Sequence, residues 1–290
     1  MSDLPRVGII VLNYNGGTGL LACLQSLDDL DYRAKDILVV DNHSTDDSLV
    51  AAEKKFPHFT FIHNSKNEGF AKGMNSGMRL AVSKGAEWCW LFNCDALAYP
   101  QTLTTLISVA QENPQAGLLS PMIYEAGNNR VWFAKGEIDF WRMRTRHIQP
   151  TQQELIAKNY PSEFLTGCAL LIKKKLIQTI GFLDETFFLY YEDADYSLRA
   201  SLAGFACLVV AESRVAHSET SRFHPRKTYF LVYSGLLFFA KWADFYTRFY
   251  LAVYVTMRRV KNFWDRLRGG GAAAQEAYLA YRDYFENRKK

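Results

Sequence analysis

VGIIVLNY, at residues 7–14, is an apolar run of strand length that ends in polar side chains. Three similar runs follow it along the chain, namely DILVVDN (36–42), FTFIH (59–63) and EWCWLFN (87–93). Stretches with a helical spacing of apolar residues separate these runs, near 18–29, 46–56 and 70–84. Strands that alternate with helices in this way form βαβ units, so we predict an α/β, Rossmann-like fold with a mostly parallel central sheet flanked by helices.

Polar residues stand where these predicted strands end, namely Asn13, Asp41, Asn93 and Asp95. Ligands of parallel sheets bind beyond the carboxyl ends of the strands, so these four are candidate binding residues. A carboxylate at Asp41 can accept hydrogen bonds from the base or ribose of a nucleotide. Asp95 could hold a diphosphate through Mg²⁺ or Mn²⁺, with His217 completing the metal site. The alternatives are a turn-capping aspartate and a packed histidine.

The segment NEGFAKGMNSG (67–77) has glycine at every fourth position, which would let a helix lie close to the sheet. Its Asn67 and Asn75 place amides near the strand ends, where a base or a phosphate could meet them. The segment STD at 44–46 supplies candidate caps for the helix that follows it.

Gly17, Gly19 and Ala22 match a loose form of the dinucleotide-binding fingerprint, with Asp41 about twenty residues further on. In that fingerprint the first glycine itself makes the turn from strand to helix, whereas residues 13–16 intervene here. An NAD-dependent oxidoreductase is therefore only an alternative interpretation, and titration with NADH against UDP and dTDP would test it.

The segment LYYEDADYSLR (189–199) sets three carboxylates directly behind large apolar side chains. If a helix begins at Glu192, Asp195 forms an ion pair with Arg199 one turn later, and Glu192 suits the first turn. Asp193 has no such structural role. A carboxylate in a partly dry setting can be held ready for proton transfer, so Asp193 is a candidate general base.

The second half of the chain follows a mixed pattern that we expect to shape a second pocket. We predict strands near 117–123 and within 130–142, a loop rich in Gln and Pro near 148–161, and an apolar run at 164–172. The segment RMRTRH (142–147) alternates, so its arginines would share one face of a strand. That face is either simply solvated or contacts an anionic acceptor.

The C-terminal region predicts two helices near 226–246 and 248–267, a hinge at GGGAAA (269–274) and an amphipathic tail helix. We therefore divide the chain into a catalytic domain at 1–221, basic aromatic helices at 222–268, and a hinge with a tail helix at 269–290.

Charge is distributed unevenly, since residues 1–221 hold 20 Lys and Arg against 25 Asp and Glu, while 222–290 hold 14 against 5. Aromatic residues are interleaved among the C-terminal cations, which favours an anionic membrane surface as the partner and argues against nucleic acid. Packing of these aromatics on the core, or on a second subunit in a homo-oligomer, is the alternative. The longest uncharged stretch there, 228–240, is too short to span a bilayer.

Cysteine usage points to a reducing compartment. The five cysteines include no CxxC pair, and the N-terminus lacks the charged start and cleavage site of a secretory signal. We therefore expect a cytoplasmic protein, peripheral to the inner face of the cell membrane.

Several motifs together resemble those of glycosyltransferase family 2, and most closely its rhamnosyltransferase-type members. They are LNYN, VVDNHSTD, NEGFAKGMN, LFNCDA, FLTGCALLIKK and GFLDETFFLYYEDADYSLR, in this order from about residue 6 to 220. The resemblance implies a GT-A fold, here with a C-terminal helical extension. It also implies transfer of a sugar, with inversion, from a nucleotide diphosphate.

The resemblance also implies roles for individual residues. Asp193 corresponds to the general base, and Glu192 is its neighbour toward the acceptor. Asp95 and His217 correspond to metal ligands, although Asn-Cys-Asp at 93–95 has one carboxylate fewer than a full DXD motif. The residues expected at the donor nucleotide are Asn13, Asn15, Asp41, Asn67, Asn75 and Asn93.

The sequence therefore predicts an inverting hexosyltransferase that moves L-rhamnose, by preference from dTDP-rhamnose, to a hydroxyl of a cell-surface glycan or a lipid-linked acceptor. A family 2 enzyme using a UDP-sugar such as UDP-glucose or UDP-galactofuranose is the nearest alternative. A noncatalytic glycan-binding module is a further one, and it would have no use for Asp193.

Overall fold

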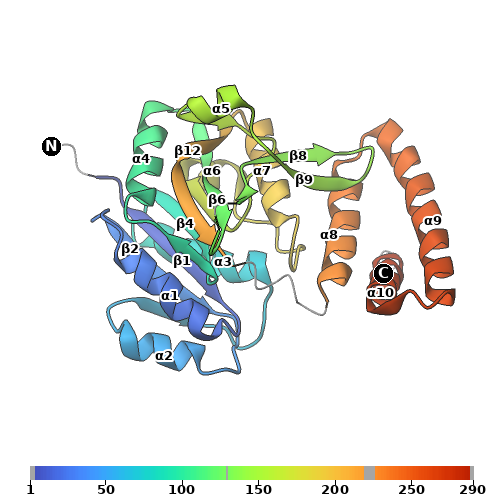
Figure 1. Ribbon diagram of the computed structural model, residues 1–290, viewed down its shortest axis with the longest axis horizontal. Helices are drawn as coiled ribbons and strands as arrows, with labels where there is room; N and C mark the ends of the chain where they lie inside the picture. The colour runs from blue at the N-terminus through green and yellow to red at the C-terminus, as the bar shows by residue number, and fades with distance from the viewer. Residues whose placement is uncertain (1–3, 129, 219–225, 288–290) are drawn as a thin grey trace.

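The computed structural model describes residues 4–128, 130–218 and 226–287. An α/β body surrounds one large sheet, and the helices α8 to α10 stand beside it at the right of the view (Figure 1). The sheet has the strand order β10-β12-β6-β11-β4-β1-β2-β3. This arrangement confirms the predicted α/β class.

The first four predicted strands form one parallel half of the sheet. They are β1 (Val7–Asn13), β2 (Lys35–Asp41), β3 (Thr60–His63) and β4 (Trp88–Asn93), and β1 lies between β2 and β4. The helices between them are α1 (Gly17–Asp28), α2 (Ser48–Lys55) and α3 (Phe70–Ser83). Since the chain runs from β1 outward to β2 and β3 and then returns to β4, the gap between β1 and β4 is the topological switch point of the sheet.

Two glycines of α3 account for its close approach to the sheet. A Cβ atom at Gly73 would lie 2.5 Å from a methyl carbon of Leu12, and one at Gly77 would lie 2.4 Å from a methyl carbon of Ile10. Gly69 has a different role, because it precedes the helix with φ +81° and faces the carbonyl oxygen of Phe188. The predicted glycine packing is thus confirmed for the two positions inside the helix.

The second half of the sheet mixes parallel and antiparallel strands. β11 (Ala169–Lys173) runs antiparallel between β4 and β6 (Ala116–Glu125), and β12 (Ala206–His217) runs parallel to β6. The end of β12 also pairs with β5 (Ala96–Ala98), with His217 opposite Ala96. This pairing brings the end of β12 beside the segment that follows β4.

The remaining elements of the body lie around these strands, and they correct one expectation. They are α4 (Thr102–Glu112), β7 (Val131–Phe133), β8 (Lys135–Asp139), β9 (Arg144–Ile148), α5 (Gln152–Ile156), β10 (Asn159–Pro161), α6 (Lys174–Ile180) and α7 (Glu192–Leu202). The stretch 148–161, predicted as a loop, contains α5 and β10. Thr151 and Glu154 form a capping box that stabilises the short helix, a local signal that the Gln and Pro content obscured.

The arginines of the segment 142–147 are held by acids of the facing strand β8. Arg142 and Arg144 lie 3.3 and 3.7 Å from a carboxylate oxygen of Asp139, and Arg146 pairs with Glu137. The structure therefore supports the solvated, ion-paired interpretation of this segment.

The helix α8 (Lys227–Trp242) packs into the core of the α/β body. Its Phe238 and Phe239 are buried in the same apolar cluster as the sheet, and its Ser234 donates a hydrogen bond to the carbonyl of Leu189 at 2.7 Å. The proposed domain boundary at 221 and 222 lies outside the described residues. Packing on the core, the alternative to membrane contact, therefore holds for α8.

The helices α9 (Phe245–Leu267) and α10 (Gly271–Asn287) lie further out. The turn between β8 and β9 reaches α9, where Tyr250 and Tyr254 donate hydrogen bonds to the carbonyls of Trp141 and Arg142. The predicted hinge at 269–274 is wrong in its second half, because α10 begins at Gly271 and includes the alanines, whose helix propensity is high. Within the described residues, no helix is both long and apolar enough to cross a membrane.

Candidate active site

Asn13 and Asp41 end two adjacent strands and contact each other directly. Both side chains are buried, and the Asn13 amide donates to Asp41 Oδ1 at 2.8 Å and to Ser48 Oγ at 2.9 Å. Ser44 donates to the same Asp41 oxygen at 2.6 Å. Ser44 thus braces the aspartate instead of capping α2, and this network holds the Asp41 carboxylate in one orientation at the carboxyl edge of the sheet.

The other predicted donor residues have different surroundings. Asn15, at φ +54°, accepts a hydrogen bond from Thr45 N at 2.7 Å and so braces the segment after β2. Asn67 accepts from Asn42 at 2.9 Å and orders the turn before α3.

Asn75 is fully buried and lies away from these residues. Its amide donates to the carbonyl of Leu183 and to Glu185, and its oxygen accepts from Leu183 N at 3.1 Å. Asn75, which belongs to α3, thus holds the loop that precedes α7 against that helix.

Asp95 and His217 are 122 residues apart in sequence, and their side chains meet at the end of β12. Asp95 Oδ1 lies 3.1 Å from His217 Nε2. Burial alone would lower the pKa of His217, but nearby Cys168 and the hydrogen bond to Asp95 raise this pKa to about 10. The Asp95 carboxylate that the imidazole faces therefore favours its protonated form.

This pair fits a divalent cation as a partial ligand set. An aspartate oxygen and an imidazole nitrogen are ligands that Mn²⁺ accepts, and Asp95 Oδ1 and His217 Nε2 face each other. The described chain contains no group of three or more His, Cys, Asp and Glu that could hold a metal by themselves. The protein would thus supply two ligands and leave positions for a bound substrate.

Asp193 lies in the first turn of α7, where backbone groups hold its half-buried carboxylate. One oxygen accepts a hydrogen bond from Gly167 N at 3.0 Å and the other from Ala194 N at 2.8 Å. Partial burial raises the pKa of Asp193, and these two hydrogen bonds oppose that rise. A carboxylate with a raised pKa is a stronger base when it is ionised.

Glu192 precedes it and is almost completely buried, at 4% exposure. Its Oε2 has no hydrogen-bond partner among the described residues. Burial, reinforced by the adjacent Asp193 charge, raises the pKa of Glu192 well above its usual range. The preceding Tyr190 and Tyr191 adopt φ values of +67° and +70°, a strained backbone that turns the chain sharply into α7.

Asp195 has the structural role that its spacing predicts. It is fully buried, and its Oδ2 accepts from Arg199 Nε at 2.9 Å, which confirms the predicted ion pair. Its other oxygen contacts Lys241 at 2.7 Å and accepts from Trp242 Nε1 at 2.9 Å. Asp195 therefore joins α7 to α8, a connection that helical spacing alone could not predict.

A cavity of about 280 Å³ brings the catalytic candidates together. Its wall includes Asn93, Glu192, Asp193 and His217. Further residues line the cavity that the sequence alone did not single out, and these are Thr145, His147, Gly167, Tyr190 and Lys227. Four of them fall within quoted stretches, namely RMRTRH, FLTGCALLIKK and LYYEDADYSLR. The lining comes from separate parts of the chain, so no local pattern showed that these residues meet.

Two adjacent carboxylates and a histidine on the wall of a cavity at the end of β4 are the arrangement of an enzyme site. Residues 8–181 match the family described as glycosyl transferase family 2. Because this match spans more than half of the chain, the protein belongs to glycosyl transferase family 2 and is a glycosyltransferase with a GT-A fold. The NAD-dependent alternative is thereby set aside.

Curated relatives are similar over most of the chain. An N-acetylglucosaminyl-diphospho-decaprenol L-rhamnosyltransferase of Mycobacterium tuberculosis is 26% identical over 229 residues, which are 72% of this chain and 75% of that protein. A dTDP-rhamnosyl transferase, RfbF of Shigella flexneri, is 24% identical over 63% of this chain and 59% of its own length.

Solved structures share the fold at low sequence identity. GalNAc-T7 with UDP, GalNAc and Mn²⁺ aligns with a TM-score of 0.65 at 19% identity, over 74% of this chain and 43% of that one. The mannosyltransferase PcManGT from Pyrobaculum calidifontis, in complex with GDP-Man and Mn²⁺, aligns with a TM-score of 0.61 at 15% identity, over 98% and 88% of the two chains.

Proposed function

We propose that this glycosyltransferase transfers L-rhamnose from dTDP-rhamnose, with inversion, to a hydroxyl of a cell-surface glycan or a lipid-linked acceptor. The observation that carries the proposal is the Asp193 carboxylate, held by two backbone N–H groups on the wall of a cavity that His217 also lines. The names of the two rhamnosyltransferase relatives support the choice of donor sugar.

In this reaction Asp193 accepts the proton of the acceptor hydroxyl as its oxygen forms a bond to the anomeric carbon of the sugar. The bond from that carbon to the diphosphate breaks on the opposite face, and the nucleoside diphosphate departs with the bonding electrons. One displacement of this kind inverts the anomeric carbon. The neutral Glu192 carboxyl, which its raised pKa favours, can donate a hydrogen bond to the acceptor.

Asp41, Asn13, Asn15, Asn67 and Asn93 are the proposed contacts of the donor nucleotide. Asn75 belonged to the same set, but its bonds to Leu183 and Glu185 support an indirect role through the loop before α7.

A divalent cation, Mg²⁺ or Mn²⁺, is the proposed cofactor. Asp95 and His217 would hold it, and when bound it would neutralise charge that develops on the departing diphosphate. His217 would lose its proton on binding the metal, so affinity for the metal should rise with pH. Two solved structures with the same fold contain Mn²⁺, which supports this choice.

A UDP-sugar is the second candidate donor, because the structural neighbours include proteins solved with UDP or UDP-GlcNAc. The deciding experiment presents dTDP-rhamnose, UDP-glucose and UDP-galactofuranose to the purified full chain and measures release of the nucleoside diphosphate. Excess EDTA should depress the release, and Mn²⁺ or Mg²⁺ should restore it. Retention of configuration in the product would overturn the inverting mechanism, and full activity in EDTA would overturn the metal assignment.

The enzyme is proposed to work at the inner face of the cell membrane, bound through α9. Seven apolar side chains of α9 form an exposed stripe that recurs every three or four residues, namely Tyr246, Phe249, Val253, Met257, Val260, Trp264 and Leu267. Lys261 and Arg268 lie along one edge of this stripe by helical spacing. A helix with cations beside an apolar stripe suits an anionic bilayer surface.

A further inference from the structure

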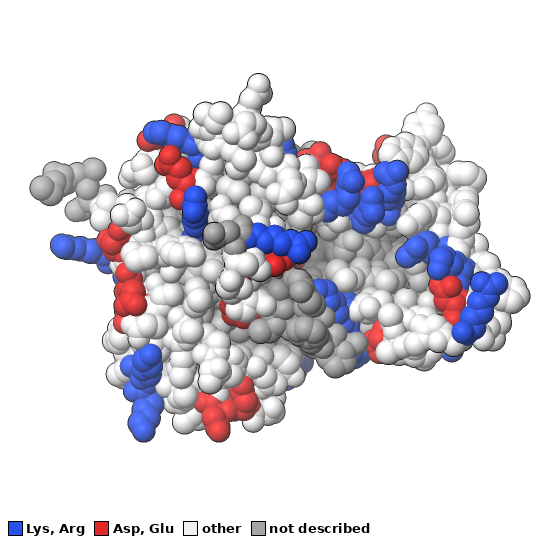
Figure 2. Space-filling model, viewed as in Figure 1, with Lys and Arg blue, Asp and Glu red and all other residues white. Residues whose placement is uncertain are grey.

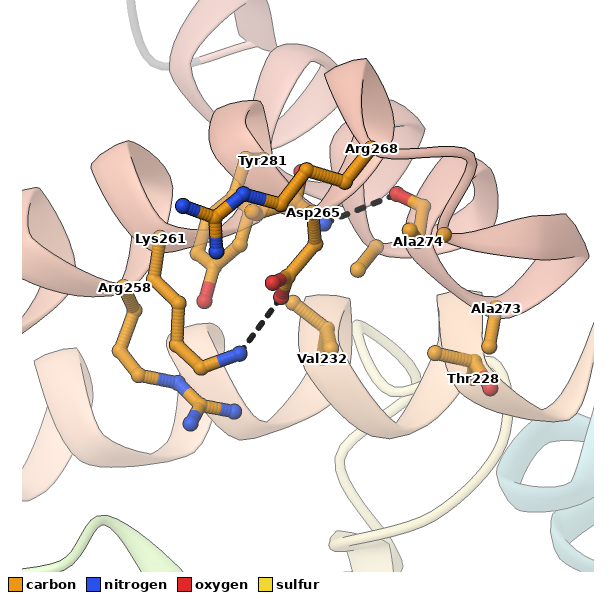
Figure 3. Close-up of a pocket in the computed structure, with 12 residues that line it drawn as sticks. Thr228, Val232, Arg258, Lys261, Asp265, Arg268, Ala273, Ala274 and Tyr281 are labelled. Atoms are coloured by element: carbon orange, nitrogen blue, oxygen red, sulfur yellow. Dashed lines mark hydrogen bonds and ion pairs between the residues drawn. The ribbon is translucent and has the colours of Figure 1, made fainter.

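A second large cavity lies among the three C-terminal helices, apart from the cavity that holds Asp193. It has a volume of about 460 Å³ and is lined by residues of α8, α9 and α10 (Figure 3). The α10 side of it carries the small side chains of Ala273, Ala274 and Ala277, which leave space between the helices. A volume of this size accommodates a small ligand.

Three cations line this cavity and only one carboxylate does. Figure 3 shows the charged ends of Arg258, Lys261 and Arg268 turned toward the same side of the cavity, near the Tyr281 hydroxyl. Lys261 forms an ion pair with Asp265 at 2.6 Å. In the part of the chain that the structure describes, neither arginine pairs with a carboxylate, so two positive charges are not neutralised. Figure 2 shows Lys and Arg side chains beside an acidic patch over the outer helices at the right of the view.

Tyr281 adds a polar group to the charged wall. Its side chain is buried at 9% exposure, and burial raises the pKa of its hydroxyl, while the positive charge of Arg258 opposes that rise. The hydroxyl therefore stays protonated at neutral pH and can donate a hydrogen bond to an anion beside the guanidinium.

We propose that this cavity is a binding site for a phosphate-bearing ligand, either a diphosphate in solution or the phosphate head group of a lipid. Arginine presents planar donor pairs that match phosphate oxygens, and two such groups around one cavity suit a doubly charged anion. The neighbouring apolar stripe of α9 is exposed, so a phosphate with an apolar tail can reach the cavity from a bilayer surface.

The proposed phosphate site and the transferase cavity share the helix α8. Lys227 and Leu231 of α8 line the transferase cavity, while Thr228 and Val232, on the adjacent face of the same helix, line the cationic one. A ligand in the cationic cavity therefore contacts the helix that also forms part of the active site. Binding of the phosphate does not depend on which sugar is transferred.

The test uses the full chain in EDTA, so that pyrophosphate cannot bind through a metal at Asp95. Calorimetry measures the affinity for inorganic pyrophosphate in the parent protein and in the double variant Arg258→Gln with Arg268→Gln. A second double variant, Arg258→Lys with Arg268→Lys, keeps the charge and removes the planar donor pairs. The charge-matched control is Lys54→Gln with Lys55→Gln on α2. All four side chains are on helix surfaces, so the fold should be retained.

We expect both arginine variants to bind pyrophosphate at least tenfold more weakly, about 1.4 kcal/mol, and the α2 control to bind like the parent. Equal affinity in the parent and the glutamine variant would overturn the site. If the lysine variant binds pyrophosphate as tightly as the parent, positive charge alone explains the binding. That result would also overturn the proposed arginine site.

Flotation with phosphatidylcholine vesicles, with and without phosphatidic acid, distinguishes the two sources of phosphate. If the ligand is a lipid head group, phosphatidic acid recruits the parent protein, the glutamine variant loses this response, and pyrophosphate competes. If the ligand is soluble, the two proteins float equally while their pyrophosphate affinities differ. Both results support the phosphate site, and each assigns a different ligand to it.

Discussion

Glu192 and Asp193 are neighbours in the sequence, but their carboxyl groups have opposite surroundings. Two backbone N–H groups hold the Asp193 carboxylate at the cavity wall. Glu192 is buried and leaves one oxygen without a partner among the described residues. The first arrangement stabilises an anion that can accept a proton, and the second favours a neutral acid.

The substitution Asp193→Asn keeps the shape of the side chain and removes its basic lone pair. We expect transfer to the acceptor to fall by about 10²-fold or more, the usual scale for losing a positioned base. Affinity for the donor nucleotide should be unchanged, since backbone N–H groups hold the Asp193 carboxylate and the proposed nucleotide contacts lie elsewhere. Initial rates with the true acceptor and calorimetric binding of the nucleoside diphosphate measure the two quantities.

Asp195→Asn serves as the control, because Asp195 is fully buried and paired with Arg199 and Lys241. It should lower the thermal midpoint, since breaking a buried ion pair leaves an unpaired charge, and should affect the rate of the folded protein much less. If Asp193→Asn keeps the parent rate and Glu192→Gln is inactive, Glu192 is the base.

Glu192 also links stability to pH. Because its pKa is raised in the folded protein, its contribution to stability is complete below the ordinary glutamate pKa and is lost as pH rises through the folded value. Glu192→Gln removes this loss, so the variant should have the higher thermal midpoint at neutral pH. The difference between the thermal midpoints of the variant and the parent should narrow toward acid pH and widen toward alkaline pH. Thermal midpoints of both proteins from about pH 4 to about pH 9 test this, and a gap independent of pH would contradict it.

At the scale of elements, the contact between α3 and β1 depends on glycine. A Cβ at Gly77 would lie 2.4 Å from Ile10 Cγ2 and 3.0 Å from Ile10 Cγ1, so the helix would have to move away from the sheet. We expect Gly77→Ala to lower the free energy of unfolding by about 1–3 kcal/mol, as overpacking does. Denaturant titration measures the change.

Gly19→Ala in α1 is the matched control, because the nearest atom to its added Cβ is 3.7 Å away. This variant should be neutral or more stable, since alanine favours a helix by about 1 kcal/mol over glycine. Equal effects of the two substitutions would show that close packing of α3 is not what requires Gly77.

At the scale of the whole molecule, the body and α8 form one packed unit, while α9 exposes its apolar stripe. Deleting the chain from residue 222 would remove Phe238 and Phe239 from the core. A loss of membrane binding in that truncated protein could then result from unfolding. Substitutions within the exposed stripe separate these two effects. They leave the helix in place and change only the surface that would meet a bilayer.

Phe249→Glu with Trp264→Glu should abolish flotation with anionic vesicles, because Phe249 and Trp264 are 77% and 52% exposed and would sit in the interface. Binding of the parent should weaken as salt rises. Val50→Glu with Leu202→Glu, equally exposed on the α/β body, should float like the parent. Unchanged flotation of the α9 variant would contradict membrane contact, and a loss of parent dimers would identify the stripe as a subunit interface.

Local pattern was enough to predict the parallel half of the sheet, the helices between its strands and the ion pair of Asp195 with Arg199. Each of these depends on residues a few positions apart, where periodicity and side-chain reach are set by the backbone geometry of one element. The order of motifs was also enough to predict the family and the GT-A fold.

Tertiary structure alone decided which groups are buried and what they meet. Among the residues that the structure describes, it left one oxygen of the buried Glu192 without a partner, joined the Asn75 amide to Leu183 and Glu185, and placed Lys241 and Trp242 on Asp195. It also enclosed the cationic cavity between three helices. These contacts join residues that are distant in sequence, and their burial depends on how whole elements pack, which the spacing of residues within one element does not encode.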